Sequence, residues 1–350
     1  MGKIFEYVRK YGDYTFQEKA FNDVDNLVLC ALFYIDLTNT IVNDGEYTLE
    51  VVGRDYLEKT SFKEVSKRGI SQRNAYMLLK LLITKARYKK IILSDYVYDI
   101  NPNKMFGAIT FKITNNLSYI CFEGTDEQIS GWREDGELAY RFPVESQVDA
   151  INYVNRHVSL LGPKVIIGGH SKGGNLALIS AMYLSYLKKL KVLKVYSNDG
   201  PGLRKKEMES KQYRQIKNKY IHFVPENSVV GVMLRSDTFD VVKTTKKSII
   251  SHLIINWIIE DDKVVDGTMT EKSKKLYNSM ISWLDKHNDE EREKTIDSVF
   301  NVLSECKITT VPSIMKIESV IKILQNLNTI DKQTKDLLKD LIVYNYKNVK

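Results

Sequence analysis

The chain has 350 residues, of which 43% are hydrophobic and 27% are charged. At about 150 residues per domain this length predicts about two domains, and the composition excludes a disordered, collagen-like or purely coiled-coil chain. The 52 basic and 44 acidic residues leave a net charge of +8. This excess is too small and too dispersed to indicate nucleic-acid binding without a supporting motif.

The sequence predicts neither a secretory signal nor a membrane-spanning segment. The start of the chain lacks the apolar segment of a secretory signal peptide, and the longest apolar runs fall short of the ~20 residues that span a bilayer. Three widely spaced cysteines, an odd number, suit reduced thiols. We therefore expect a cytoplasmic protein without a transmembrane segment. We interpret the lysines of its basic helices as ordinary solvent-exposed residues. Peripheral contact of these helices with an anionic membrane is the weaker alternative.

The first hundred residues are predicted to be helical, with a strand at the end. Apolar residues at helical spacing over 16–37 predict an amphipathic helix, and Ser71 stands where the N-cap of a second helix is expected. The period then changes. Two short runs rich in β-formers, 105–113 and 117–122, are separated by Thr-Asn-Asn and predict a hairpin.

The middle of the chain alternates strand and helix, which indicates a mostly parallel sheet covered on both faces. We expect helices at 147–161, 176–190 and 205–219, and strands at 164–168, 193–197, 220–224 and within 239–245.

The pattern after about residue 265 is wholly helical, with expected helices at 274–284, 291–303, 314–327 and 335–346. The chain is therefore expected to divide near 261–267. An α/β domain would span 1–265, with its first 90 or so residues helical, and a helical domain would span 266–350.

One segment carries a chemical pattern, Gly169-x-Ser171-x-Gly173 between an apolar strand and an apolar helix. This is the pattern of a nucleophile elbow. A sharp strand-to-helix turn strains the serine, and side chains two residues on either side would collide, so both positions require glycine. The helix behind it offers N–H donors to a developing oxyanion. We predict that Ser171 is a nucleophile; the alternative is a glycine turn with a structural serine.

A serine nucleophile needs a base, which in this arrangement follows it in the chain. Three histidines lie downstream. His222 falls inside a predicted strand and His287 in the helical tail, so a structural and a surface role are expected for them. His252 follows the last predicted strand, where a loop can return it to Ser171. We predict His252 as the base, against the alternative of a core histidine.

The acid that orients this base has two candidates. Asp199 and Glu226 each follow a predicted strand of the parallel sheet, so both are expected at the same edge as Ser171. We favour Asp199 and keep Glu226 as the alternative.

The oxyanion donors are predicted to be the backbone N–H groups of Lys172 and of Thr125, which follows a strand and a glycine. The segment 129–140 is predicted to be a short amphipathic helix beside the site. Its apolar residues Trp132, Leu138 and Tyr140 would serve as a lid and contact substrate; an ordinary surface helix is the alternative.

Five blocks in order resemble the Mbeg-like family of bacterial α/β-hydrolase-like proteins, which is related to fungal-type class 3 lipases. They are Phe122-Glu123-Gly124-Thr125-Asp126, Gly131-Trp132-Arg133-Glu134-Asp135, Gly169 to Ala177, Tyr196 to Gly202 and Val224 to Leu234. The resemblance covers roughly residues 20–260. It implies an oxyanion role for Thr125 and a lid role for 129–140. The Asp-x-Val-Pro acid of those lipases has no aspartate here, so the acid stays open.

Together these patterns predict an α/β-hydrolase-like sheet with a helical C-terminal extension, acting on a small-molecule or lipid ester through a Ser-His-acid triad. No metal or organic cofactor is expected, because the scattered histidines offer no ligand pair. The second hypothesis is a hydrolase fold that serves as a binding or scaffold module.

Overall fold

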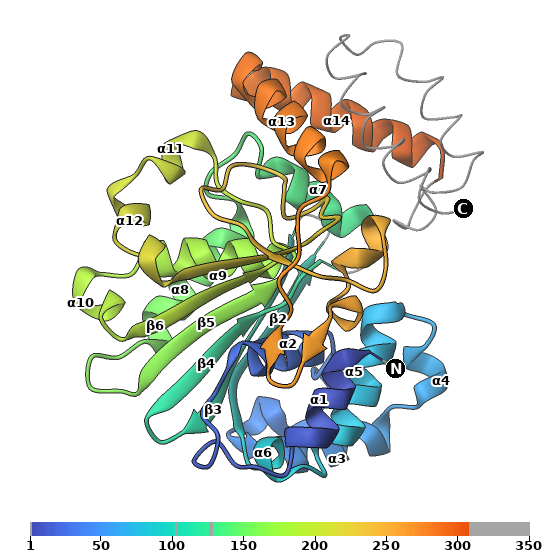
Figure 1. Cartoon of the computed structure of the whole chain (residues 1–350), viewed down its shortest axis with the longest axis vertical. Helices are drawn as coiled ribbons and strands as arrows, with labels where there is room; N and C mark the ends of the chain where they lie inside the picture. Colours follow the sequence, from blue (N-terminus) through green and yellow to red (C-terminus); the bar gives the residue numbers. More distant parts are fainter. Residues whose placement is uncertain (1, 102–103, 126–128, 308–350) are drawn as a thin grey trace.

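A computed structural model describes residues 2–101, 104–125 and 129–307. Within them, eight strands form one sheet in the order of the chain (Figure 1). The neighbours from β1 to β4 pair antiparallel, and those from β4 to β8 pair parallel. The strands are β1 Tyr47–Thr48, β2 Ile92–Asn101, β3 Lys104–Thr114, β4 Leu117–Phe122, β5 Lys164–His170, β6 Val192–Asn198, β7 Tyr220–Pro225 and β8 Asp240–Val242.

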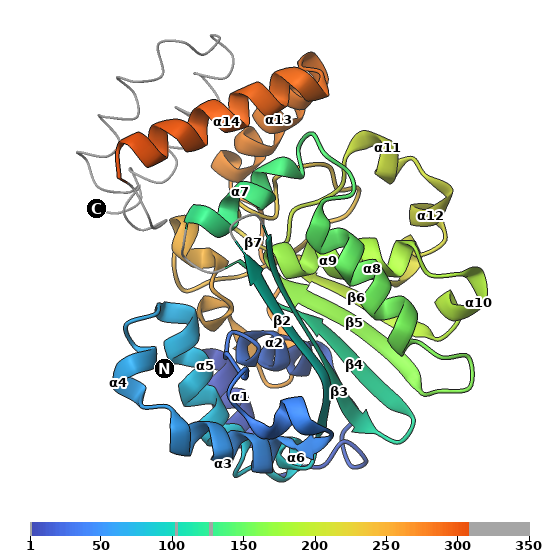
Figure 2. The ribbon, with the colours of Figure 1, turned by 180° about the vertical axis from the view of Figure 1, so that it is seen from behind.

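Helices cover both faces of this sheet, as Figures 1 and 2 show. One face carries the N-terminal helices α1 Lys3–Tyr11, α2 Asp23–Leu32, α3 Leu49–Lys59, α4 Phe62–Val65, α5 Ile70–Leu82 and α6 Ala86–Lys89. The other carries α8 Glu145–His157 and α9 Lys172–Met182, with the short helices α10 Tyr186–Lys189, α11 Lys205–Met208 and α12 Lys211–Arg214 beyond them.

The alternation of side chains along β4 explains the two layers. Tyr119 and Cys121 are buried among the N-terminal helices, whereas Ile120 and Phe122 are buried against α8 and α9. Because both faces are covered, the strand reads as a continuous apolar run. The mostly parallel sheet between two helical layers, with its strand-to-helix turn after β5, is an α/β-hydrolase-like fold, as predicted.

Most predicted elements of the middle are confirmed, but two helices there and two in the N-terminal part differ from expectation. The helix expected over 16–37 begins only at Asp23, because Asn22 forms a capping box with Asp25. The N-cap prediction for Ser71 is wrong: α5 begins at Ile70, so Ser71 lies in its first turn.

The helices expected over 176–190 and 205–219 are each broken. Ser185 starts the separate helix α10 and Ser210 starts α12, each by accepting a hydrogen bond from a backbone N–H three residues on. Serine caps therefore interrupt stretches whose apolar spacing alone predicts one helix.

The C-terminal part adds two long helices, α13 Glu271–Lys286 and α14 Asp289–Glu305, which lie beside α7 Ile129–Glu137 (Figure 2). The helices expected at 314–327 and 335–346 lie outside the described residues. The expected division near 261–267 overlaps a small hairpin of β9 Ile259–Glu260 and β10 Lys263–Val264, and the Gly267 N–H donates to the Val241 carbonyl. The division into two domains stays a prediction.

No helix within the described residues combines the length and the apolar character needed to cross a membrane.

A buried ion pair joins the N-terminal helices. The Arg87 guanidinium donates to both carboxylate oxygens of Asp25 at 2.8 and 2.5 Å, and both side chains are fully buried. Tyr88 also donates to Asp25, at 2.7 Å. The next residue, Asn26, donates to Asn198 at the end of β6, so this cluster fixes α2 against the strand that leads to the site.

We expect Arg87→Met to lower the free energy of unfolding by about 3–5 kcal/mol, because the Asp25 carboxylate would be left buried without its cation. Urea unfolding measures this. The control is Lys294→Met, which breaks an exposed pair with Glu290 and should change stability by less than about 1 kcal/mol. Equal effects of the two variants would contradict the assignment.

Candidate active site

The turn after β5 has the strained geometry that the glycine pattern predicts. Ser171 has φ 56° and ψ −130°, outside the regions that residues with a side chain favour. A Cβ on Gly169 would lie 2.2 Å from the carbonyl carbon of Gly173, and a Cβ on Gly173 would lie 2.3 Å from the Phe122 oxygen. The Ser171 N–H donates to the Asn198 carbonyl at 3.0 Å. Packing of backbone against backbone therefore imposes the turn.

His252 and Asp199 meet at the same sheet edge. His252 ends the 3₁₀ helix η3 Ser248–His252, and its Nδ1 lies 2.6 Å from Asp199 Oδ2. Asp199 is fully buried, and its other oxygen accepts from the Ser228 hydroxyl at 2.5 Å and the Gly231 N–H at 3.0 Å. An ionised carboxylate only accepts, so Nδ1 of His252 carries the proton and Nε2 is left as the basic nitrogen.

The second acid candidate lies elsewhere. The Glu226 carboxylate faces the backbone N–H groups of Thr244 and Thr268, both at 3.4 Å, and Gly267 packs against its side chain. No contact joins it to His252 within the described residues. The structure thus brings Asp199, and not Glu226, to the predicted base.

The other two histidines that follow Ser171 in the chain each contact a main-chain carbonyl. His222 is fully buried between the Gly200 carbonyl and the Ser236 hydroxyl, and burial lowers its pKa to about 4. His287 lies near the end of α13, 2.9 Å from the Trp283 carbonyl.

Ser171 is more enclosed than the sequence suggests. The residue is 1% exposed, whereas a nucleophile has to be within reach of its substrate. Within the described part of the chain no hydrogen bond joins it to His252. The base reaches the turn through the preceding residue instead: the rings of His170 and His252 lie 4.3 Å apart. Hydrogen bonds between nucleophile and base are often long in ligand-free sites and shorten when substrate binds.

Each predicted oxyanion donor is held by an acidic residue of α7. The Thr125 hydroxyl donates to Asp135 at 2.7 Å, which leaves the Thr125 backbone N–H as the group able to face an oxyanion. The Lys172 side chain is buried and donates to Glu134 at 2.8 Å and to the Met105 carbonyl at 2.7 Å. Its backbone N–H lies in the first turn of α9, where the helix offers no acceptor.

The predicted lid residues occupy different environments. Trp132 is partly exposed, but Leu138 is buried in a cluster with α13, and Tyr140 is buried with its carbonyl accepting from Arg204. A Cβ on Gly136 would lie 2.9 Å from Ile296 of α14. The helix α7 is therefore packed between the sheet edge and the C-terminal helices, and a lid role for it stays a prediction.

Four residues around the site were not assigned from the sequence: Tyr34, Glu134, Asp135 and His170. His170, Glu134 and Asp135 stand inside the blocks of the family resemblance, so their position was a signal. Tyr34 follows α2, more than 130 residues before His170, and nothing local marks it.

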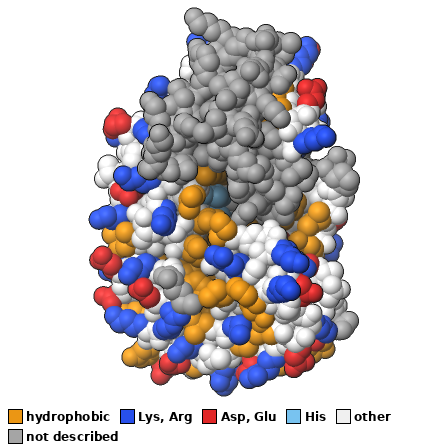
Figure 3. Space-filling model, turned by 90° about the vertical axis from the view of Figure 1, so that its right-hand side faces the viewer, with side chains coloured by type: hydrophobic (Ala, Val, Ile, Leu, Met, Phe, Trp, Pro, Cys, Tyr) orange, Lys and Arg blue, Asp and Glu red, His pale blue; other side chains and the backbone are white. Residues whose placement is uncertain are grey.

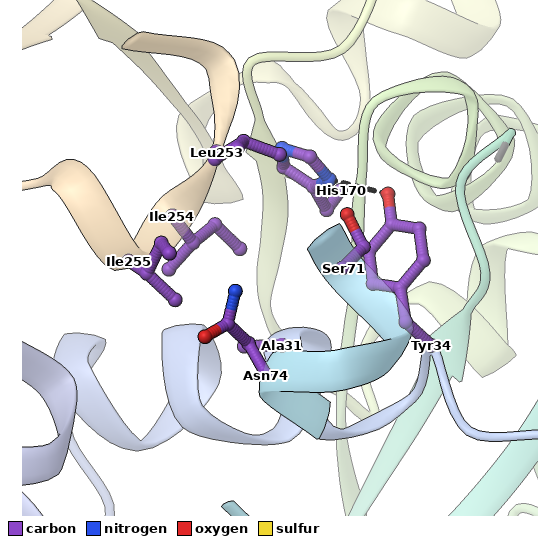
Figure 4. A pocket seen from close by; sticks show the side chains of 8 residues that line it. All are labelled: Ala31, Tyr34, Ser71, Asn74, His170, Leu253, Ile254 and Ile255. Atoms are coloured by element: carbon purple, nitrogen blue, oxygen red, sulfur yellow. Dashed lines mark hydrogen bonds between the residues drawn. The ribbon is translucent and has the colours of Figure 1, made fainter. Parts of the chain in front are cut away.

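A small pocket opens beside His170 (Figure 4). Tyr34 and His170 line one side, and the apolar segment 253–255 lines another. Its volume of about 20 Å³ holds about one water molecule. Figure 3 shows a histidine at the bottom of a hollow on the surface, with apolar side chains extending below it.

A family comparison identifies the chain. The model of the family described as Mbeg1-like matches residues 82–301, more than half of the sequence. The chain belongs to the Mbeg1-like family. This confirms the resemblance predicted from the five sequence blocks. No curated protein matches the chain. A crystal structure of M37 lipase is similar at 15% identity, covering 61% of this chain and 69% of that one with a TM-score of 0.35.

The strain at Ser171 is testable through stability. Replacing Ser171 by Gly should give a protein about 1–2 kcal/mol more stable than replacing it by Ala, because only glycine adopts this conformation without cost. Urea unfolding of the two variants measures the difference.

Ser180, buried in the regular part of α9, provides the matched control. There the order should reverse, with Gly about 1 kcal/mol less stable than Ala. The same order at both positions would contradict a strained turn at Ser171.

A second prediction concerns Asp135, whose pKa burial raises to about 6 despite the opposing charge of Lys172 and the hydrogen bond from Thr125. An unfolded aspartate titrates near 3.9. Between the two values the folded state keeps a proton that the unfolded state has lost. Stability should therefore be greatest below about pH 4 and fall by roughly 3 kcal/mol as the pH rises through about 6.

Asp135→Asn should remove this part of the pH dependence in urea unfolding followed over the same range. Asp297→Asn, on the partly exposed face of α14, should leave it in place. An unchanged slope in Asp135→Asn would show that this carboxyl does not titrate as described.

Proposed function

We propose that this protein is a serine hydrolase that cleaves a carboxylic ester of a lipid or another acyl compound. The observation that supports this best is the 2.6 Å contact between His252 Nδ1 and the buried carboxylate of Asp199, beside a strained serine turn. A neutral imidazole oriented by an acid next to such a serine is the arrangement that nucleophilic acyl transfer requires.

In this proposal the Ser171 oxygen attacks the ester carbonyl while its proton passes to Nε2 of His252. Asp199 holds the imidazole and stabilises the imidazolium that forms, and it stays ionised. The charge that develops on the carbonyl oxygen meets the backbone N–H groups of Lys172 and Thr125. The proton then moves from His252 to the departing alcohol, and water repeats the sequence to release the acid from Ser171.

The acids of α7 support the same site indirectly. Asp135 accepts a hydrogen bond from the Thr125 hydroxyl, and Glu134 accepts one from the Lys172 ammonium. The side chains of Thr125 and Lys172 therefore do not compete with the backbone N–H donors of the same residues. Preorganised donors of this kind stabilise a transition state because they need no rearrangement as the charge develops, and losing one costs about 3 kcal/mol.

A second candidate is a hydrolase fold without turnover that serves as a binding module. The enclosure of Ser171, 1% exposed and without a hydrogen bond to His252 in the described structure, favours it. The two candidates differ in whether Ser171 reacts.

Labelling with a fluorophosphonate probe, followed by peptide mass spectrometry, tests the proposal. The wild-type protein should carry the probe on Ser171 and hydrolyse p-nitrophenyl esters, because an activated serine attacks phosphorus as it attacks a carbonyl. Ser171→Ala should lose both properties. Ser180→Ala, near the far end of α9, should keep both the labelling and the hydrolysis. Absence of labelling and of ester turnover in the wild-type protein would support the binding module instead.

The acid assignment is tested in the same assays. Asp199→Asn should lower kcat by about 10³–10⁴-fold, the loss expected when the imidazole is held in the wrong tautomer. Glu226→Gln should stay within about threefold of the wild type, since in the described structure its carboxylate faces backbone N–H groups and not His252. The reverse order would make Glu226 the acid.

A further inference from the structure

We propose that Tyr34 and His170 form a hydrogen-bonded relay that positions the base His252. The inference rests on the proposed function and extends it to two residues that touch neither the reacting ester nor Asp199. They are positioning residues, because they act through His252 and the Ser171 turn.

The chemistry of the partners fixes the direction of the relay. His170 Nε2 lies 2.8 Å from the His252 carbonyl, which can only accept, so Nε2 carries the hydrogen. In a neutral ring Nδ1 then accepts, and the Tyr34 hydroxyl 2.5 Å away donates to it. The relay thus runs from the Tyr34 hydroxyl, through the His170 ring, to the backbone of His252. Figure 4 shows its first hydrogen bond, between Tyr34 and His170.

The surroundings keep both groups in these protonation states. Burial, together with the nearby His252, holds the pKa of His170 well below its ordinary value, so its ring stays neutral. Burial raises the pKa of Tyr34 well above its ordinary value, so the phenol keeps the proton that it donates. A neutral His170 also adds no positive charge beside His252 when that ring accepts the proton of Ser171.

The relay contacts all three parts of the proposed site. His170 is the residue before Ser171, and its ring lies 4.3 Å from that of His252 at an angle of 34°. The third part is the loop of Thr125. A Cβ on Gly124 would lie 2.3 Å from the Tyr34 hydroxyl and 2.5 Å from the His170 carbonyl oxygen. The nucleophile turn, the base and the oxyanion loop are therefore fixed against the same two side chains.

The base itself needs such support. His252 ends a single 3₁₀ turn in which Ile250 is 46% exposed. It lies outside the sheet, whereas Ser171 and Asp199 directly follow the strands β5 and β6. Asp199 fixes one ring nitrogen, while the relay fixes the backbone from which the ring projects. A base displaced by about 1 Å would lose much of its rate contribution while substrate binding was unaffected.

Steady-state hydrolysis of p-nitrophenyl butyrate tests the relay. Tyr34→Phe should lower kcat about tenfold with KM changed less than twofold, because the reacting geometry and not substrate binding is lost. His170→Gln keeps a donor for the His252 carbonyl and should retain more activity than His170→Leu. Tyr34→Phe should cost nothing further in the His170→Leu background, since the relay is already broken. Tyr153→Phe, a buried tyrosine bonded to Thr110, should keep wild-type kcat.

Additive losses of kcat in the double variant would overturn the relay. Losses of kcat in Tyr153→Phe and His170→Gln that parallel their losses of thermal stability would also overturn it. A structural role alone predicts that kcat follows stability in all variants.

Nitrogen-15 NMR of the histidine rings provides a measurement that does not depend on turnover. The relay predicts a neutral His170 with hydrogen on Nε2 between about pH 5 and pH 8, where an ordinary histidine titrates. It also predicts that Tyr34→Phe shifts the Nδ1 resonance. A His170 ring that is cationic at neutral pH or carries hydrogen on Nδ1 would overturn it. Failure of Ser171 labelling would instead overturn the proposed function, and the NMR result would then decide the relay alone.

Discussion

Close packing of backbone around Ser171 is the constraint on which the rest of the site depends. Gly169 faces Gly173, and Gly173 faces the carbonyl of Phe122 at the end of β4, with no room for a side chain at either position. This packing holds Ser171 in a conformation that costs of the order of 1–3 kcal/mol, which the burial of β5 and α9 on both faces must offset. A turn made of backbone contacts cannot relax without separating the sheet from the helix behind it.

The strand order then gathers the remaining groups at this edge. β6 lies between β5 and β7, so Asp199, which directly follows β6, lies within reach of the turn after β5. The Ser171 N–H donates to the carbonyl of Asn198, the residue before Asp199. His252 arrives from a loop beyond the sheet and meets Asp199 there. The acids of α7 contact the other side of the same edge through Thr125 and Lys172. Distant parts of the chain therefore converge on one strained residue.

The fold and the turn were predictable because their signals are local. Continuous apolar runs indicate which strands are buried on both faces, and Gly169-x-Ser171-x-Gly173 states a steric requirement that any chain with this turn must meet. The choice between Asp199 and Glu226 was not predictable in this way, since both follow neighbouring strands. It depends on where the loop carrying His252 comes to lie. Leu138 illustrates a related limit. The apolar spacing over 129–140 indicates that one face of the predicted helix is buried, but it does not indicate that α13 packs against Leu138. Tyr34 carries no local signal and is known only from its contact with His170.

The structure of the protein after reaction with an organophosphonate ester tests the central claim most directly. The account predicts phosphorus bonded to Ser171 Oγ, with the phosphoryl oxygen about 2.7–3.1 Å from the backbone nitrogens of both Lys172 and Thr125. Nε2 of His252 should lie within hydrogen-bonding distance of Ser171 Oγ. Phosphorus bonded to another residue, or a phosphoryl oxygen that points away from both nitrogens, would contradict the account.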